Sequence, residues 1–335
     1  MTPRERVLSA LRGEKREKAV ASCVTQVGTV QAMEKLGIFW PEAHRDPEKM
    51  VELGASLYKL VGLETCRIPF CLTVQAEALG CEVDVGAVDR QPSVKKPLPS
   101  IPENLPSDFL ERGRVPTVIK AVELMKRRYE DLPKMVGLEA VTTLAGHIVG
   151  VERLMMMFIK QRDVVAKVLD LCVKANIEYA KAIIDAGADV VVPCDPLASP
   201  DLLSPRDFAS LIKPRLKELA DAIRKRGAVG VLHICGNARR IVKDMAETGF
   251  DALSVEEKVD IREAKAVIGP KPALVGNISS AKTLLMGSPA DVEREARAAI
   301  EAGVDVLAPG CGIAPRTPLA NIKVLADVAK EYRGM

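Results

Sequence analysis

The sequence predicts an α/β fold, arranged as a single (β/α)8 barrel of the TIM type. From about residue 130 onward, short runs rich in β-branched residues alternate with long amphipathic runs. Strands that alternate with helices of this length form parallel sheets, and eight such units close into a barrel. An open, doubly wound sheet is the rival fold. No G-x-G-x-x-G motif follows the first predicted strand, which weakens the dinucleotide-binding version of that rival.

Eight segments have the apolar, β-branched composition of buried strands. They are residues 19–25, 63–70, 134–141, 188–196, 228–236, 250–257, 272–279 and 304–312. Most of them are followed by a helical pattern. The patterns at 164–187 and 205–227 end in glycine, which is common at the C-terminus of a helix.

Two segments lie outside this alternation. Residues 1–18 have the pattern of a helical extension, which we expect to cover the end of the barrel opposite the active site. Residues 81–114 are irregular and rich in proline, and we expect them to form an excursion inserted over the active face. Barrels of this class often exceed 200 residues as one domain. The whole chain, residues 1–335, is therefore predicted to be one barrel domain.

The composition excludes several classes of protein. The chain has 48 basic and 45 acidic residues, and aromatic residues make up only 3%, so no platform for stacking nucleic-acid bases is indicated. The N-terminus lacks the apolar core of a secretory signal, and no stretch approaches the roughly 18 apolar residues that span a bilayer. We expect a cytoplasmic protein that binds neither nucleic acid nor membranes.

Eight cysteines occur in the chain, and without an export signal they are not expected to form a disulfide framework. The active site of such a barrel lies at the C-terminal ends of the strands. There the segment 228–236 carries His233 and Cys235, whose side chains share one face because they are two residues apart on a strand. The segment 304–312 carries Cys311 between two glycines, where the backbone bends freely.

These three residues offer one nitrogen and two sulfurs, a soft ligand set that suits zinc. A single His-x-Cys pair is usually a packed pair without metal, and a lone cysteine in an apolar strand is usually core. Both motifs fall at the end of the barrel where function is expected, and that coincidence favours a zinc site formed by His233, Cys235 and Cys311.

Three further polar residues fall near strand ends. Alternation along 250–257 turns Leu253 and Val255 toward the outer helices, which predicts that Glu256 points inward as a fourth zinc ligand that yields to substrate. Asn277 and Asp195 end two other predicted strands and are candidate substrate-binding residues. A zinc site with two thiolates and a displaceable position lowers the pKa of a bound substrate thiol, which favours delivery of a thiolate.

The motifs that carry this constellation resemble those of a known family. They include SCVTQVG at 22–28, WPEAH at 40–44, RQPSV at 90–94, DPLASPDLLSP at 195–205, VLHICGN at 231–237 and LAPGCGIAP at 307–315. On these blocks the chain resembles the uroporphyrinogen decarboxylase superfamily over its full length. Within that superfamily it resembles the zinc-dependent methylcobamide:coenzyme M methyltransferases.

The resemblance implies a reaction and a site. A separate corrinoid protein would present a methylcobamide, and the thiol of coenzyme M would accept the methyl group, with His233, Cys235 and Cys311 as zinc ligands. The corrinoid would dock over the barrel mouth, around Cys311 and the 81–114 excursion. Arg67, at the end of a predicted strand, is a candidate for binding the sulfonate of coenzyme M.

Three alternatives stay open on the sequence, the third being a non-catalytic barrel that only binds a corrinoid protein or stores zinc. Relatives of this kind pass methyl groups to other acceptors, including folates, so another acceptor is possible on the resemblance alone. A decarboxylase-like lyase is the second alternative. Decarboxylases of the family carry an arginine-bearing motif near the first strand, and SCVTQVG at 22–28 has no arginine there to bind a polycarboxylate.

Overall fold

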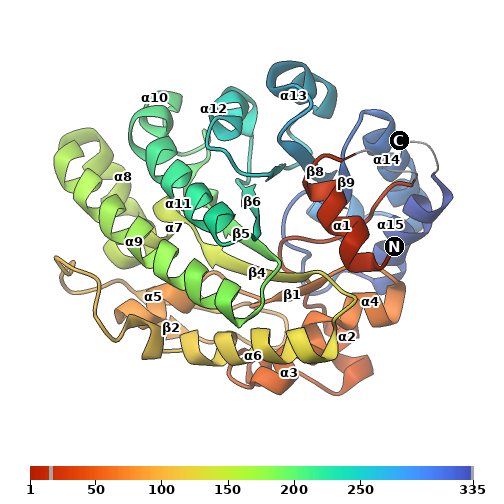
Figure 1. Cartoon of the computed structure of the whole chain (residues 1–335), viewed down its shortest axis with the longest axis horizontal. Coiled ribbons are helices and arrows are strands. Elements are labelled where there is room, and N and C mark those ends of the chain that lie inside the picture. The colour runs from red at the N-terminus through yellow and green to blue at the C-terminus, as the bar shows by residue number, and fades with distance from the viewer. Residues whose placement is uncertain (15–17, 333–335) are drawn as a thin grey trace.

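The computed structural model describes residues 1–14 and 18–332. Helices surround a curled, parallel sheet (Figure 1). The seven strands of the sheet follow the order β1-β4-β5-β6-β7-β8-β9, and every neighbouring pair is parallel. They are β1 (Cys66–Ile68), β4 (Lys134–Glu139), β5 (Val190–Cys194), β6 (Val229–His233), β7 (Ala252–Ser254), β8 (Ala273–Ile278) and β9 (Val306–Pro309). Each lies within a predicted strand segment, so the α/β barrel class is confirmed.

The predicted first strand, residues 19–25, does not form a regular strand and makes only an isolated bridge between Ala21 and Leu307. The segment nevertheless lies in the gap between β9 and β1. Leu307 donates its N–H to the carbonyl of Val20, and Glu64 donates to the carbonyl of Ala21. The Ser22 N–H donates in turn to the carbonyl of Leu307. On the β1 side, the hydroxyls of Ser22 and Thr65 donate to the carbonyls of Glu64 and Cys23. The prediction of eight regular, closed strands is therefore corrected to seven strands and an extended segment.

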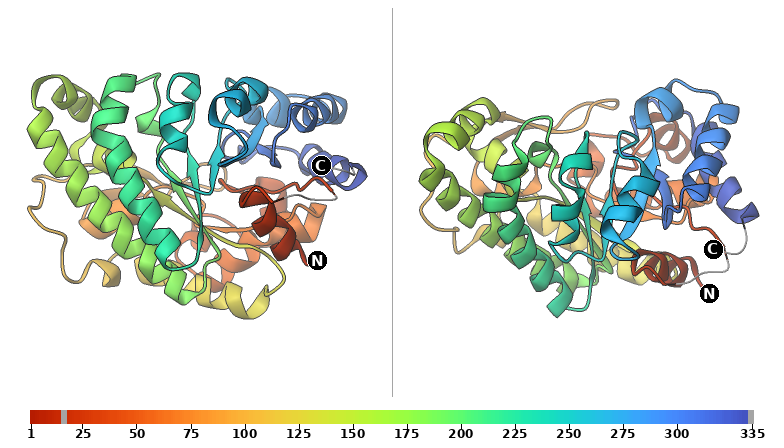
Figure 2. Two further views of the ribbon diagram at one scale, coloured as in Figure 1. Left: turned by 45° about the horizontal axis from the view of Figure 1, so that its top comes forward. Right: turned by 90° about the horizontal axis from the view of Figure 1, so that it is seen from above.

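The interior of the curled sheet is filled by small and β-branched residues. Helix α1 (Pro3–Leu11) closes the end at which the strands begin. Leu8 and Leu11 of α1 belong to the same buried cluster as the inward-facing strand residues. Arg4 of α1 pairs with Asp189, which directly precedes β5, so α1 lies at the N-terminal ends of the strands. The red helix beside the sheet in Figures 1 and 2 is this cap. Part of the predicted 1–18 extension, residues 15–17, lies outside the described residues.

The remaining helices cover the outside of the sheet. They are α2 (Val30–Leu36), α3 (Pro47–Gly54), α4 (Ser56–Val61), α5 (Val74–Leu79), α6 (Val115–Arg128), α7 (Val141–Val149), α8 (Val151–Lys160), α9 (Arg162–Ala186), α10 (Pro205–Asp207), α11 (Lys213–Lys225), α12 (Val242–Ala246), α13 (Ile261–Ile268), α14 (Pro289–Glu301) and α15 (Leu319–Glu331). The helix predicted at 164–187 is α9. The one predicted at 205–227 consists of α10, a π-helical turn at Phe208–Ile212, and α11.

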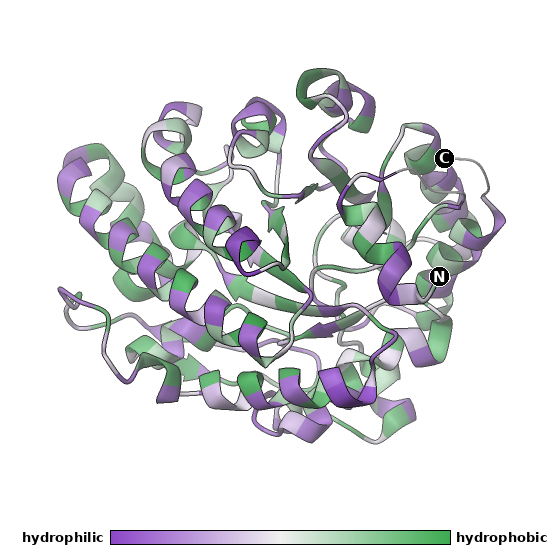
Figure 3. Cartoon of the chain, viewed as in Figure 1, coloured by the Kyte–Doolittle hydropathy of each residue, from purple (hydrophilic) through white to green (hydrophobic). Residues whose placement is uncertain are grey.

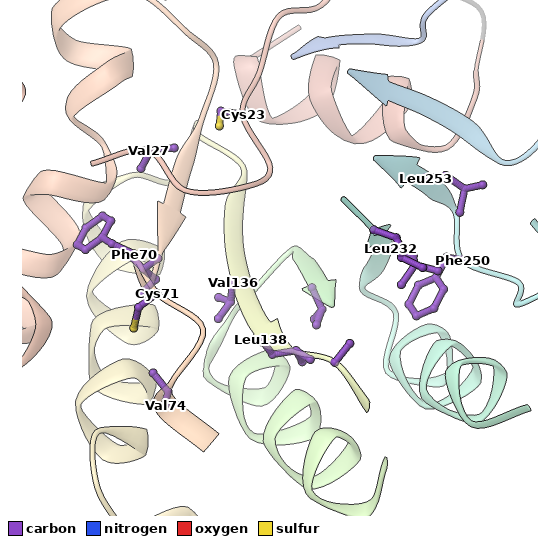
Figure 4. Packing of buried hydrophobic residues seen from close by; sticks show 14 of the residues in the cluster. Cys23, Val27, Phe70, Cys71, Val74, Val136, Leu138, Leu232, Phe250 and Leu253 are labelled. Carbon is purple, nitrogen blue, oxygen red and sulfur yellow. The ribbon is translucent and has the colours of Figure 1, made fainter. Parts of the chain in front are cut away.

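Strand residues that alternate with the interior ones pack against these helices. Leu232 and Leu253 lie near Phe250 on the outer side of β6 and β7 (Figure 4), while their neighbours Val231 and Ala252 face inward. Hydrophobic and hydrophilic stripes run along α6, α9 and α11 (Figure 3), as expected for helices with one face on the core. The alternation expected for Leu253 is therefore confirmed.

The predicted excursion at 81–114 contains the antiparallel hairpin of β2 (Glu82–Asp84) and β3 (Ser93–Lys96). It also contains a short 3-10 turn at Phe109–Glu111. No single helix in the described ranges has the length and apolarity needed to cross a bilayer. The bent pair α7 and α8 reaches that length and composition only when its two members are joined across an angle of 107°.

Candidate metal centre

The end of β6 carries two of the predicted metal ligands. His233 is the last residue of β6 and is 2% exposed, and Cys235 follows two residues later. The Nε2 atom of His233 lies 3.0 Å from the Sγ atom of Cys235. The two side chains therefore meet at the C-terminal end of the strand, as their spacing predicts.

Cys311 joins this pair from the end of β9. Its Sγ atom lies 3.3 Å from that of Cys235, and the ligand atoms of His233, Cys235 and Cys311 all lie within 4.8 Å of one another. A Cβ atom at Gly310 would lie 3.1 Å from the Cα atom of Glu256, so glycine at this position lets the end of β9 approach the loop after β7. The three donors are close enough to share one metal ion.

The electrostatics of the two thiols favour a single proton between them. The hydrogen bond with Cys235, together with His233, lowers the pKa of Cys311, although burial opposes this. The same hydrogen bond, together with burial, raises the pKa of Cys235. The site therefore favours the thiolate form of Cys311, and a bound cation is the natural partner for a thiolate.

A pocket of about 220 Å³ opens beside the three donors. Its wall includes all three of them, together with Arg67 and Gln91. Gln91 belongs to the hairpin of the 81–114 excursion, so the excursion reaches the active face as expected. A larger hollow of about 920 Å³ lies at the α1 end of the barrel, and no predicted site residue lines it.

Arg67 lies on β1 and is 2% exposed. Its guanidinium donates hydrogen bonds to the backbone carbonyls of Val24, at 3.3 Å, and Pro69. Within residues 1–14 and 18–332 it forms no ion pair with a carboxylate. A Cβ atom at Gly137 on β4 would lie 2.0 Å from a guanidinium nitrogen, so this glycine makes the room that Arg67 occupies. A buried cation that faces a pocket without a carboxylate partner is suited to an anionic ligand.

Comparison with known families identifies the chain. The family model of uroporphyrinogen decarboxylase (URO-D) matches residues 2–332. The chain belongs to the URO-D family. Among its relatives in this family is "Methylcobamide:CoM methyltransferase MtaA" of Methanosarcina barkeri, 45% identical over 99% of this chain and 98% of the relative. "Methylcobamide:CoM methyltransferase MtbA" of Methanosarcina mazei is 38% identical over 99% of this chain and 98% of the relative.

A solved structure supports the same placement within the URO-D family. It is described as "methyltransferase from Methanosarcina mazei" and superposes with a TM-score of 0.95. The two chains are 45% identical, and the match covers 99% of each. The geometry described above therefore belongs to a fold already seen for a methyltransferase of this family.

Two residues predicted to bind substrate point elsewhere in this URO-D family member. The carboxylate of Asp195 is fully buried and accepts hydrogen bonds from the backbone N–H groups of Thr142 and Thr143, at 3.1 and 2.7 Å. It therefore caps the N-terminus of α7. The amide of Asn277 donates to the backbone carbonyl of Val259 at 2.8 Å. Neither side chain lines the pocket, because each one satisfies a neighbouring loop or helix end instead.

Glu256 lies close to the metal centre but outside the group of three donors. Strand β7 ends at Ser254, so alternation no longer fixes the direction of Glu256 two residues later. Burial and the nearby Cys311 raise the pKa of Glu256, while a hydrogen bond from the N–H of Gly236 lowers it. The structure thus brings Glu256 beside the thiols and leaves its role as a fourth ligand a prediction.

Sequence reasoning missed the hydroxyl groups around the ligands. Ser254 contacts His233, and Thr25 and Ser280 contact the backbone of Cys311. Alternation with Leu253 turns Ser254 inward, but nothing in the sequence gives the register that sets it beside His233 on the neighbouring strand. Thr25 and Ser280 lie in segments whose paths depend on the tertiary fold.

Proposed function

We propose that this chain catalyses zinc-dependent transfer of a methyl group from a methylated corrinoid protein to the thiol of coenzyme M. The observation that carries the proposal is the group of His233, Cys235 and Cys311 opening into a pocket that also holds the buried cation Arg67. The names of the full-length relatives at 45% and 38% identity support it, since both are methylcobamide:CoM methyltransferases.

The residues present fit zinc. One imidazole nitrogen and two thiols are a typical zinc ligand set, and a catalytic site keeps a further position for substrate. When bound, zinc lowers the pKa of a coordinated thiol so that the thiolate predominates at neutral pH. His233, Cys235 and Cys311 would hold the metal, and the adjacent pocket admits the acceptor to it.

The pocket suits a small acceptor that carries one thiol and one anionic group. We assign the sulfonate of coenzyme M to Arg67, because a guanidinium binds a tetrahedral oxyanion through two parallel hydrogen bonds. Among the described lining residues of the pocket, Arg67 is the only lysine or arginine. That supports a monoanionic ligand over the polycarboxylate that a decarboxylase of the family would bind.

The transfer itself is a displacement at carbon. The thiolate sulfur of the acceptor forms a bond to the methyl carbon while the cobalt–carbon bond breaks and leaves both electrons on cobalt. Arg67 fixes the far end of the acceptor so that its sulfur faces the mouth of the barrel. Phe70 and Leu72 in the pocket wall exclude water from the nucleophile. Glu256, beside Cys311, would supply the remaining ligand to the metal when no acceptor is bound.

The corrinoid would be supplied by a partner protein. A pocket of about 220 Å³ accommodates the acceptor but not a corrinoid ring, so the methyl donor must approach from outside the mouth. The hairpin of the 81–114 excursion borders that mouth through Gln91. We therefore place the docking surface for the corrinoid protein around Cys311 and this hairpin.

The test compares Cys311→Ala with Cys66→Ala, a matched change at a buried cysteine that does not line the pocket. Metal content and methyl transfer from methylcobalamin to coenzyme M are measured on all three proteins. We expect about one zinc per chain in the wild type and in Cys66→Ala, and loss of both zinc and methylation in Cys311→Ala. Wild-type protein without zinc, or a Cys311→Ala protein that still methylates coenzyme M, would overturn the proposal.

A further inference from the structure

The imidazole of His233 is held from behind by a serine on the neighbouring strand. In the β6–β7 pairing His233 lies opposite Ser254, and the His233 Nδ1 atom is 3.0 Å from the Ser254 Oγ atom. Parallel strands in register direct paired side chains to the same face of the sheet. The other ring nitrogen, Nε2, is the one that faces Cys235. The serine thus contacts the nitrogen that the metal does not use.

The backbone of Cys311 is held in a similar way from two sides. The hydroxyl of Thr25 donates to the Cys311 carbonyl at 2.9 Å. The hydroxyl of Ser280 donates to the same carbonyl at 3.2 Å and accepts the Cys311 N–H at 3.2 Å. Thr25 comes from the extended segment between β9 and β1, and Ser280 from the turn after β8. Cys311 is therefore fixed by elements on both sides of β9, although glycines flank it.

These hydroxyls stand among apolar interior residues. The inward neighbours of Ser254 are Ala252 on its own strand and Val275 on the next, and Ser254 itself is fully buried. A buried hydroxyl costs free energy unless it is hydrogen-bonded, and an alanine would fill the same place without that cost. The only side-chain partner of Ser254 in the described chain is His233. Packing alone does not explain a serine at this position.

We infer that Ser254, Thr25 and Ser280 are positioning residues of the metal centre. Ser254 accepts the Nδ1–H of His233, which fixes the ring orientation and the tautomer that leaves Nε2 open to the metal. Thr25 and Ser280 set the backbone of Cys311 so that its sulfur meets Cys235. This inference rests on the proposed zinc site and adds to it the residues that preorganise the ligands before metal arrives.

The experiment measures zinc affinity by competition with a chromophoric chelator for the wild type, Ser254→Ala and Ser56→Ala. Ser56 is the matched control, because it is a fully buried serine in α4 that does not line the pocket. Loss of a partner behind a metal-bound histidine lowers metal affinity by about 10- to 100-fold. We expect that loss in Ser254→Ala and an affinity within about threefold of wild type in Ser56→Ala.

A second readout separates positioning from general destabilisation. Cobalt(II) in place of zinc reports ligand geometry through its visible absorption bands. We expect those bands to shift in Ser254→Ala and in Thr25→Val, to return toward wild type in Ser254→Thr, and to stay unchanged in Ser56→Ala. Unchanged affinity and spectrum in Ser254→Ala overturn the inference while the zinc site stands. A wild-type protein that binds no zinc overturns the proposed function instead.

Discussion

Arg67 and Asp195 are two buried charged residues at the C-terminal ends of strands, and the protein compensates their burial in different ways. The carboxylate of Asp195 receives the N–H groups at the start of α7, so its hydrogen bonds are internal. The guanidinium of Arg67 has backbone carbonyls on one side and the pocket on the other. Asp195 thus caps a helix, whereas Arg67 keeps guanidinium N–H groups available to bind a ligand in the pocket. Their positions in the sequence do not distinguish the two roles, because the direction of each side chain depends on the neighbouring elements.

The burial of Asp195 makes stability depend on pH. Burial raises the pKa of Asp195 to about 6, although the N–H groups of Thr142 and Thr143 oppose the shift. Between about pH 4 and 6 the folded state holds a proton that the unfolded state has released, so stability falls as pH rises through this window. The expected loss is on the order of 2–3 kcal/mol from this group. Above about pH 6, the contribution of Asp195 to the free energy of unfolding no longer changes with pH.

Urea unfolding checks this prediction. It is measured on the metal-free wild type and on metal-free Asp195→Asn, each at pH 4.5 and pH 7. The asparagine cannot titrate, so the difference in free energy of unfolding between the two proteins should be larger at pH 4.5. The variant should be less stable at both values, by about 1–3 kcal/mol at pH 7, because its NH2 group faces a backbone donor. An identical difference at the two pH values would contradict the pKa shift.

At the scale of elements, periodicity predicts where strands lie better than where they end. Seven of the eight predicted strands contain an observed one, because buried parallel strands are continuous apolar runs. The exception at 19–25 keeps a few backbone hydrogen bonds to its neighbours, and the hydroxyls of Ser22 and Thr25 donate to further backbone carbonyls. β7 ends three residues before Glu257. Since alternation holds only within a strand, it gave the outward direction of Leu253 correctly and could not fix the direction of Glu256.

One glycine on β4 couples the sheet to the pocket. Because a Cβ atom at Gly137 would overlap the guanidinium of Arg67, Gly137→Ala should displace that side chain from the pocket wall. We expect the KM for coenzyme M to rise about 10-fold or more, as in Arg67→Gln, consistent with loss of a charge-assisted hydrogen bond of about 1.5–3 kcal/mol. Zinc content should not change.

Gly230→Ala on β6 is the control for this prediction. Its Cβ atom would lie 2.7 Å from the ring of Phe250, on the outer side of the sheet. That change should lower stability and leave the KM near wild type. Steady-state kinetics with coenzyme M as the varied substrate measures the KM of both variants, and chemical denaturation measures their stability. Equal KM values for Gly137→Ala and Gly230→Ala would remove the argument that Gly137 serves Arg67.

Over the whole molecule, the two ends of the barrel differ in function: one contributes stability and the other carries the candidate metal centre. The N-terminal ends of the strands are closed by α1 and by ion pairs such as Arg4 with Asp189. The C-terminal ends carry the three metal-ligand candidates, the pocket and the hairpin of the excursion. In barrels of this class the C-terminal face carries catalysis and the opposite face contributes stability. Changes at the two ends should therefore separate in their effects.

Leu11→Ala tests that separation. Leu11 is fully buried where α1 meets the strand interior, and loss of a buried leucine side chain costs about 2–5 kcal/mol of stability because it leaves a cavity. Under conditions where the variant is folded, its zinc affinity should stay within about threefold of wild type, since α1 touches none of the ligands. Val267→Ala, at a 54% exposed position on α13, should change stability by less than about 0.5 kcal/mol. Chemical denaturation and chelator competition on the same samples give both quantities. A zinc affinity that falls in proportion to stability would mean that the closed end and the metal centre form one cooperative unit.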